Sequence, residues 1–204
     1  MIQVKVLLGM LLMIIALGLS ISPGSAAAQD KGYAEGDMVL GSENAPVTVI
    51  EYASYTCPAC ANFHNTTFSD FKEKYVDTGK VRFIFREFIR NQLDLAAALL
   101  ARCAGPDSFY GITGMIFRQQ SSWMDAEDKL ASLQQIGRFA GVSQERWQAC
   151  LKDEALANKI LETTQKAMQE HKVDATPTFI VNGEKHTGSL SLDEFDKVLA
   201  KHLP

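Results

Sequence analysis

Two cysteines separated by two residues, Cys57 and Cys60, form the clearest chemical motif of the sequence. At this spacing the thiols can close into a small disulfide and open again, so the motif indicates thiol–disulfide exchange. Pro58 and Ala59 lie between the two cysteines, and a Thr176-Pro177-Thr178 step stands far downstream, before a strand-like run. A proline in that position offers a surface against which a substrate chain docks.

The elements predicted around the motif favour a reactive first cysteine. Residues 47–52 are rich in β-branched side chains and predict a central strand that ends shortly before Cys57. Pro58 suits the first turn of a helix, and the apolar periodicity that follows predicts one continuous helix to about Val76. Unpaired N–H groups at a helix start stabilise a thiolate. We therefore expect Cys57 to be the nucleophile and Cys60 the resolving thiol.

Zinc binding is the main alternative for the same residues. Cys57, Cys60 and His64 form a C-x-x-C-x-x-x-H pattern, to which Cys103 could add a fourth ligand. Structural zinc usually takes two close ligand pairs, whereas the remaining cysteines are 47 residues apart. We therefore predict no metal, and we expect His64 to be a polar residue on the outer face of the helix.

The four cysteines allow three pairings. Pairing of Cys57 with Cys60 is the one expected of a redox motif, which leaves Cys103 with Cys150 as a structural disulfide. The alternative for the second pair is two buried, reduced thiols.

The rest of the sequence predicts a sheet domain interrupted by helices. A second strand is expected at 81–85 and a helical block at 91–172, with breaks near Gly105-Pro106, Ser121-Ser122 and Gly141. Asn182-Gly183 predicts a hairpin between strands at 178–181 and 184–187, and a closing helix follows Ser191. The expected organisation is an arm at 29–45 with a short edge strand within 33–40, a sheet domain at 46–90 and 173–204, and an inserted helical domain at 91–172.

The first 28 residues have the layout of a cleaved secretory signal peptide. One charge, Lys5, precedes an apolar stretch at 6–21, and small residues at 25–28 offer a cleavage site. An uncleaved membrane anchor is the alternative. Removal of this segment leaves 19 basic and 24 acidic residues, a net charge of −5 that argues against nucleic-acid binding.

The sequence resembles DsbA-like thiol:disulfide oxidoreductases of the thioredoxin superfamily. The segment E-Y-A-S-Y-T-C-P-A-C at 51–60 resembles their active-site region, and A-T-P-T-F at 175–179 resembles their cis-proline loop. The resemblance covers about residues 38–204. It implies an α/β, thioredoxin-like fold, with a four-stranded mixed sheet core and a helical insertion domain.

The resemblance also implies roles for single residues. Cys57 and Cys60 match the redox pair, Pro177 the cis-proline and Thr176 the residue before it. Glu51 matches a buried acid that moves protons near the resolving thiol. Ala59 departs from the strong oxidases of the family, which carry a histidine there, so we expect a less oxidising pair.

The implied activity is donation of a disulfide to reduced, unfolded substrate proteins in the periplasm. The implied partner is a quinone-linked membrane protein that reoxidises the pair, with no bound cofactor, and nothing in the sequence requires more than a monomer. The alternatives are a disulfide isomerase or reductase that is kept reduced, a copper or zinc handling protein, and a binding module that needs no thiols.

Overall fold

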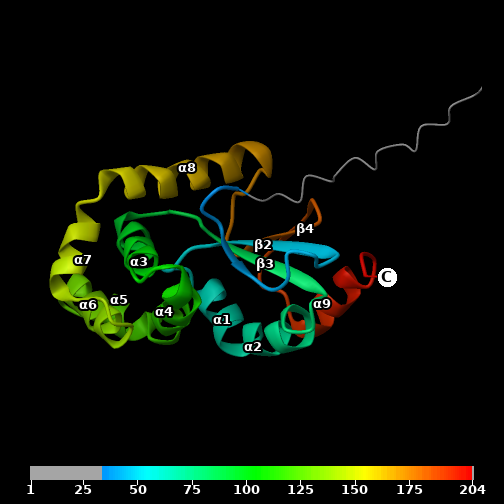
Figure 1. The fold of residues 1–204 in the computed structure, drawn as a ribbon, viewed down its shortest axis with the longest axis horizontal. Helices are drawn as coiled ribbons and strands as arrows, with labels where there is room; N and C mark the ends of the chain where they lie inside the picture. Colours follow the sequence, from blue (N-terminus) through cyan, green and yellow to red (C-terminus); the bar gives the residue numbers. More distant parts are fainter. Residues whose placement is uncertain (1–33, 204) are drawn as a thin grey trace, which may run out of the picture.

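The computed structural model describes residues 34–203, so the predicted signal peptide and cleavage site lie outside the described residues. Within them, strands form a five-stranded mixed sheet in the order β1-β3-β2-β4-β5 (Figure 1). The strands are β1 Met38–Leu40, β2 Val47–Ala53, β3 Val81–Glu87, β4 Thr178–Val181 and β5 Glu184–Thr187. β2 and β3 run parallel, and the other neighbours pair antiparallel. The predicted α/β thioredoxin-like class is confirmed, and β1 is the edge strand expected within residues 33–40, beside the four strands of the predicted core.

Short helices cover one face of the sheet. They are α1 Pro58–Thr66, α2 Phe68–Phe71, the π-helical segment η1 Lys72–Val76 and, from the C-terminal end, α9 Leu192–Leu199. The prediction of one continuous helix to Val76 is wrong, because the chain leaves helical geometry at Thr67, where φ is −121°. The preceding Thr66 hydroxyl donates to the Asn62 carbonyl at 2.8 Å, a contact that bends helices.

A block of helices fills the chain between β3 and β4. It comprises α3 Gln92–Cys103, α4 Pro106–Arg118, α5 Gln120–Asp125, α6 Lys129–Phe139, α7 Gln144–Leu151 and α8 Glu154–Glu170. The breaks predicted near Gly105 and Gly141 are present. The break predicted near Ser121-Ser122 lies two residues earlier, at Gln119, which separates α4 from α5. The buried Trp123 of α5 donates its indole N–H to the Ile116 carbonyl of α4 at 3.0 Å across this break.

The sheet separates two apolar layers. On the face covered by α1, α2 and α9, aromatic side chains dominate, and the fully buried ones include Phe63, Phe71, Phe83, Phe85, Phe179 and Phe195. On the opposite face, Ile50 and Ile84 pack against Ala167 of α8. Because strand side chains alternate between faces, Glu51 points into the aromatic layer and its neighbours Ile50 and Tyr52 point away from it.

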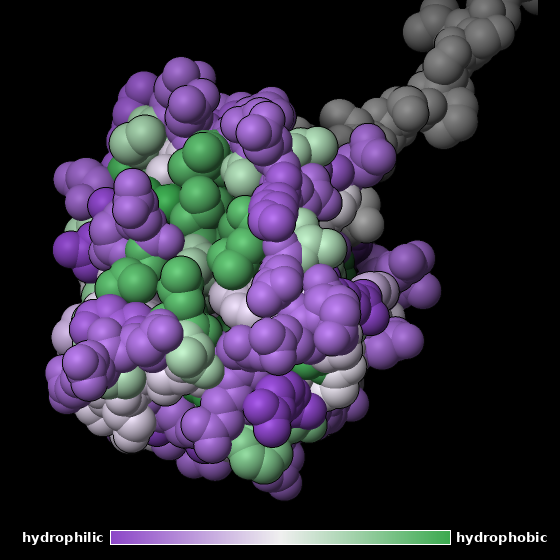
Figure 2. All heavy atoms as spheres, turned by 90° about the vertical axis from the view of Figure 1, so that its left-hand side faces the viewer, coloured by the Kyte–Doolittle hydropathy of each residue, from purple (hydrophilic) through white to green (hydrophobic). Residues whose placement is uncertain are grey.

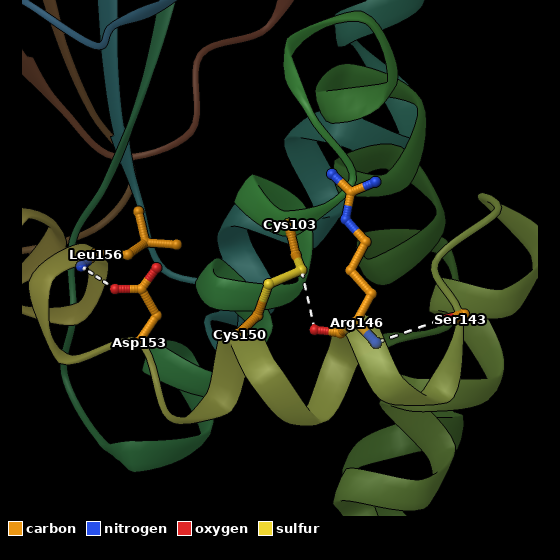
Figure 3. The surroundings of a disulfide bond; sticks show 6 residues. All are labelled: Cys103, Ser143, Arg146, Cys150, Asp153 and Leu156. Atoms are coloured by element: carbon orange, nitrogen blue, oxygen red, sulfur yellow. Dashed lines mark hydrogen bonds between the residues drawn. A yellow bond between two sulfur atoms is a disulfide. The ribbon is translucent and has the colours of Figure 1, made fainter.

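The helical block carries a disulfide between Cys103, the last residue of α3, and Cys150 near the end of α7 (Figure 3). Their Cα atoms lie 6.2 Å apart, within the usual range for a disulfide. The α7 helix is capped by Ser143, whose hydroxyl accepts from the Arg146 N–H, and Asp153 caps α8 through the Leu156 N–H.

The surface of the block is not uniformly polar. Figure 2 shows one end of the molecule, on which apolar side chains gather inside a ring of polar ones. Among the described residues, the large apolar side chains that are exposed are Leu130 and Phe139 of α6 and Leu161 and Met168 of α8. No helix within residues 34–203 has the length and apolar character needed to cross a membrane.

Candidate active site

Cys57 lies at the junction between the central strand and the first helix. It occupies the N-cap position of α1 with an extended backbone, and Pro58 begins the helix. The Cys57 N–H donates to the Ser54 carbonyl at 3.1 Å, which closes a turn after β2. Pro58 and Ala59 are exposed, whereas Cys57 is 6% exposed and Cys60 is fully buried. Both cysteines are free thiols in the structure. The more accessible sulfur is therefore that of the predicted nucleophile.

The loop before β4 lies directly against Cys57. Antiparallel pairing of Thr178 with Tyr52 brings the start of β4 to the end of β2, where the active-site turn begins. The Thr176–Pro177 peptide bond is cis, and Pro177 is buried. The Cys57 thiol donates to the Thr176 carbonyl at 3.2 Å. Two segments separated by more than a hundred residues in the sequence thus meet at one sulfur atom.

The two thiols differ strongly in their affinity for a proton. A hydrogen bond from the Cys60 thiol, with further ones from the Thr176 side chain and the Cys60 and Ala59 backbone, lowers the pKa of Cys57 to about 5 despite its burial. Burial raises the pKa of Cys60 far above its ordinary value, and its hydrogen bond to Cys57 and the charge on Glu51 add to this rise. At neutral pH Cys57 is a thiolate and Cys60 a thiol, the arrangement needed by an attacking and a resolving cysteine.

Glu51 and His64 meet beneath the cysteines. The Glu51 side chain is fully buried in β2, and its Oε2 lies 2.8 Å from Nε2 of His64, whose side chain is 3% exposed. The prediction that His64 lies on the outer face of the helix is wrong. His64 faces inward because Phe117 stacks on its ring, with 4.4 Å between the ring centroids, and Glu51 forms a hydrogen bond with its Nε2 atom.

A family model described as thioredoxin matches residues 33–201. The chain belongs to the thioredoxin family. Among solved structures, alpha-DsbA1 of Wolbachia pipientis matches with a TM-score of 0.78 and 31% identity, over 83% of this chain and 92% of that one. A protein-disulfide isomerase from Novosphingobium aromaticivorans matches with a TM-score of 0.72 and 26% identity, over 83% and 98% of the two chains. The protein is thus a DsbA-like member of the family.

Curated sequences point the same way. A putative protein-disulfide oxidoreductase of Rickettsia felis is 38% identical over 170 residues, which cover 83% of this DsbA-like chain. The match spans 61% of that relative's length.

Two residues of the helical block that the sequence did not reveal hold the active-site turn of this DsbA-like chain. The buried carboxylate of Asp94 in α3 accepts from the Ser54 hydroxyl and the Thr56 N–H through Oδ1, both at 2.8 Å. The Gln120 amide in α5 donates to the Tyr55 carbonyl at 2.8 Å and to the Cys57 carbonyl at 3.0 Å. A lone acid inside the apolar run 93–101 was a signal for Asp94, whereas Gln120 had none.

The structure therefore brings together seven of the predicted site residues: Glu51, Cys57, Pro58, Ala59, Cys60, Thr176 and Pro177. Cys103 and Cys150 lie apart from them, in the helical block. A cavity of about 660 Å³ opens on the opposite face of the sheet, lined partly by Ile50, Tyr52 and α8. Within residues 34–203, no three His, Cys, Asp or Glu side chains are arranged to hold a metal ion.

Proposed function

We propose that this chain is an exported thiol:disulfide oxidoreductase that donates a disulfide from Cys57 and Cys60 to reduced substrate proteins during oxidative folding. The observation that carries the proposal is the position of Cys57, at the N-terminal end of α1 and 3.2 Å from the carbonyl of the cis-proline loop. That position combines an accessible, stabilised thiolate with an adjacent backbone surface. The names of the DsbA-like relatives support the same chemistry.

The reaction begins from the oxidised pair. A substrate thiolate attacks the Cys57 sulfur, the bond to Cys60 breaks, and Cys60 keeps the electron pair and takes up a proton. A second substrate thiolate then attacks the substrate sulfur of this mixed disulfide, and Cys57 leaves as a thiolate. The substrate gains a disulfide, and two electrons pass to the Cys57–Cys60 pair.

The pKa difference between the cysteines favours this direction. Cys57, with a pKa of about 5, is a good leaving group in the second step, and its thiolate stabilises the reduced protein. Stabilisation of the reduced form makes the disulfide readily donated. Ala59 supplies no imidazolium, so we expect the pair to be less oxidising than in relatives that carry a histidine at this position.

The cis-proline loop is the proposed substrate platform. Thr176 turns its carbonyl toward Cys57. An extended substrate can pair with the backbone of this loop as an added strand, with its cysteine placed over Cys57.

The proposed setting is the periplasm, reached through the signal peptide expected at residues 1–28. A quinone-linked membrane protein, implied by the family resemblance, would accept the two electrons and restore the disulfide. We expect the chain to act as a monomer.

A second candidate is an isomerase or reductase that uses the same residues but is kept reduced. The observation in its favour is the similarity to the solved structure titled a protein-disulfide isomerase, at 26% identity. In that case Cys57 would attack a substrate disulfide rather than receive an attack.

The redox potential of the pair separates the two candidates. The protein is equilibrated in glutathione buffers, and the oxidation states of both cysteine pairs are read by mass after alkylation. A disulfide donor requires a potential above that of the glutathione pool, about −240 mV. A potential below that value would overturn disulfide donation and favour the reduced-state activity.

A further inference from the structure

The loop that follows β3 lies beside the active-site turn. β2 and β3 are parallel neighbours, and Ala53 at the end of β2 stands opposite Glu87 at the end of β3 (Figure 1). The Phe88 N–H continues this pairing, because it donates to the Ala53 carbonyl at 2.8 Å. Since parallel strands end at the same edge of a sheet, residues 88–91 leave the sheet next to the segment that leads to Cys57.

The buried carboxylate of Asp94 fixes this loop to the turn. Its Oδ1 accepts from the Thr56 N–H at 2.8 Å, and its Oδ2 accepts from the Arg90 N–H at 3.0 Å. The side-chain amide of Asn91 donates to the Thr56 hydroxyl at 3.0 Å. One carboxylate therefore binds the backbone of Arg90 and the backbone of the residue that precedes Cys57, which gives the loop a defined place beside the nucleophile.

Arg90 brings an exposed positive charge to this place. Asp94 binds only its backbone N–H, and within residues 34–203 the guanidinium group of Arg90 has no ion pair or hydrogen bond. Arg86 and Arg102, by contrast, are held in ion pairs that leave little of either side chain exposed. The side chain of Arg90 is thus available to a molecule that approaches the active site.

The charge on the other flank of Cys57 is negative. Antiparallel pairing of β4 with β2 places the cis-proline loop on that side, and the exposed Asp174 precedes Thr176 by two residues. The chain as a whole has 24 acidic and 20 basic residues, so most of its surface does not attract an acidic substrate. Arg90 is a local exception, because an exposed charge acts over about 10 Å at moderate salt.

We propose that Arg90 is a specificity-determining residue, which favours substrates that carry an acidic side chain beside the cysteine that attacks Cys57. This inference rests on the proposed function. A guanidinium group binds a carboxylate through up to two parallel N–H···O bonds. The acidic residue has to lie on the side of the substrate cysteine that faces the loop after β3, because Asp174 repels it on the opposite side. Asp94 acts as a positioning residue, since it holds the backbone of Arg90.

The test compares reduced dithiol peptides that differ at one residue beside the attacking cysteine. This residue is Glu, Gln or Lys, placed before the cysteine in one series and after it in the other. Oxidised protein is mixed with each peptide, samples are quenched in acid, and mass measures the rate at which the Cys57–Cys60 disulfide is reduced. In one series, the Glu peptide should react about threefold to fivefold faster than the Lys peptide at low ionic strength. The ratio should approach one in about 1 M salt.

Two variants of Arg90 and one control assign the preference to its charge. Arg90→Gln keeps the backbone bond to Asp94 and removes the charge, so the Glu and Lys peptides should react at equal rates. Arg90→Lys keeps the charge and should retain most of the preference. Lys80→Gln is the matched control, because Lys80 is also exposed but precedes β3, at the opposite edge of the sheet. Its ratio of rates should equal that of the parent protein.

The outcomes are distinct. Equal rates for the Glu and Lys peptides in both series of the parent protein would overturn the inference. So would an Arg90→Gln variant that slows every peptide by the same factor and keeps the ratio. Failure of the proposed function would instead appear as an absence of disulfide transfer from the parent protein to any peptide. The same ratios would then be measured in the reverse direction, with reduced protein attacking the peptides in their disulfide form, so the role of Arg90 is decided in either case.

Discussion

The two cysteine pairs of this chain have opposite designs. Cys57 and Cys60 are three residues apart, lie at the start of a helix and are free thiols with widely different pKa values. Cys103 and Cys150 are 47 residues apart, join α3 to α7 within the helical block and are bonded. The reactivity of Cys57 and Cys60 depends on the backbone around them, whereas the stability that Cys103 and Cys150 contribute depends on the long loop that they close.

The contrast shows what separates a redox pair from a structural one. Reactivity requires a stabilised thiolate with a path to a partner, and both are present at Cys57 beside the cis-proline loop. Stabilisation requires a long closed loop, because the loss of chain entropy in the unfolded state grows with loop length. Variants of the first pair should therefore mainly affect disulfide exchange, and variants of the second pair should mainly affect stability.

Replacing the proposed nucleophile, Cys57, should abolish exchange. Cys57→Ser should lower the rate of disulfide transfer to a reduced peptide by at least about a thousandfold, since a hydroxyl does not ionise in this range. Cys60→Ser should instead accumulate mixed disulfides that mass spectrometry detects. The Cys103→Ala/Cys150→Ala double variant should transfer disulfides at nearly the parent rate. A large loss of activity in that double variant would break the comparison.

Removing the second disulfide should cost stability instead. The loop of 47 residues corresponds to up to about 4 kcal/mol, so the double variant should unfold at a clearly lower urea concentration than the parent. The matched control is Cys57→Ala/Cys60→Ala compared with the oxidised parent, in which Cys57 carries no thiolate and the closed loop is too short to give a comparable effect. Equal midpoints for the parent and the Cys103→Ala/Cys150→Ala variant would show that this disulfide adds nothing to stability.

The redox pair should give a stability difference that depends on pH. Because the pKa of Cys57 is lowered to about 5, thiolate formation stabilises the reduced protein fully above the unfolded pKa of about 8.5, and the gain is lost as pH falls through 5. At pH 7 the gain is about 2 to 3 kcal/mol. Because the pKa of Cys60 is raised, this thiol is protonated in both the folded and the unfolded protein below the unfolded pKa, and it adds no pH dependence to the stability there.

The measurement is urea unfolding of the reduced and oxidised proteins from pH 7 to pH 4, with the Cys103–Cys150 disulfide intact in both. The reduced form should be the more stable at pH 7, and the two curves should converge near pH 5. A difference that is constant with pH would contradict a stabilised thiolate at Cys57.

The smallest effect should come from the contact between the block and the active-site turn. Gln120→Ala leaves the carbonyls of Tyr55 and Cys57 without their donor, which should lower the free energy of unfolding by about 1 to 2 kcal/mol. Gln119→Ala is the matched control, since Gln119 is exposed and its side chain makes no capping bond. If the two variants unfold alike, Gln120 does not support the turn.

Much of the fold was predictable because its signals are local. The β-branched run at 47–52, Asn182-Gly183 and the Ser191 cap lie within a few residues of the structure that they specify, and all three elements are present. The break at Thr67 was missed because a side-chain bond to the backbone, rather than sequence periodicity, marks it. The break at Gln119 lies two residues before the predicted Ser121-Ser122.

Some residues of the candidate site could likewise be predicted from local motifs, whereas others could not. Cys57, Cys60 and Thr176-Pro177 belong to short motifs that can be recognised without the structure. His64 and Gln120 act through partners 13 and 63 or more residues away, so their inward orientation follows only from tertiary packing. A histidine on a helix has no sequence pattern that distinguishes a solvent-facing position from one that binds a buried carboxylate.

The hydrogen bonds of Asp94 and Gln120 set a lower limit on how far this protein can be miniaturised. An engineer who trims residues 91–172 to a short linker, in order to obtain a minimal redox domain, would also delete the groups that bind Ser54, Thr56 and the carbonyl of Cys57. The C-P-A-C segment would remain, but its turn would have lost partners from two helices. Any smaller version therefore has to keep α3 and α5, or supply new donors and acceptors at the same points.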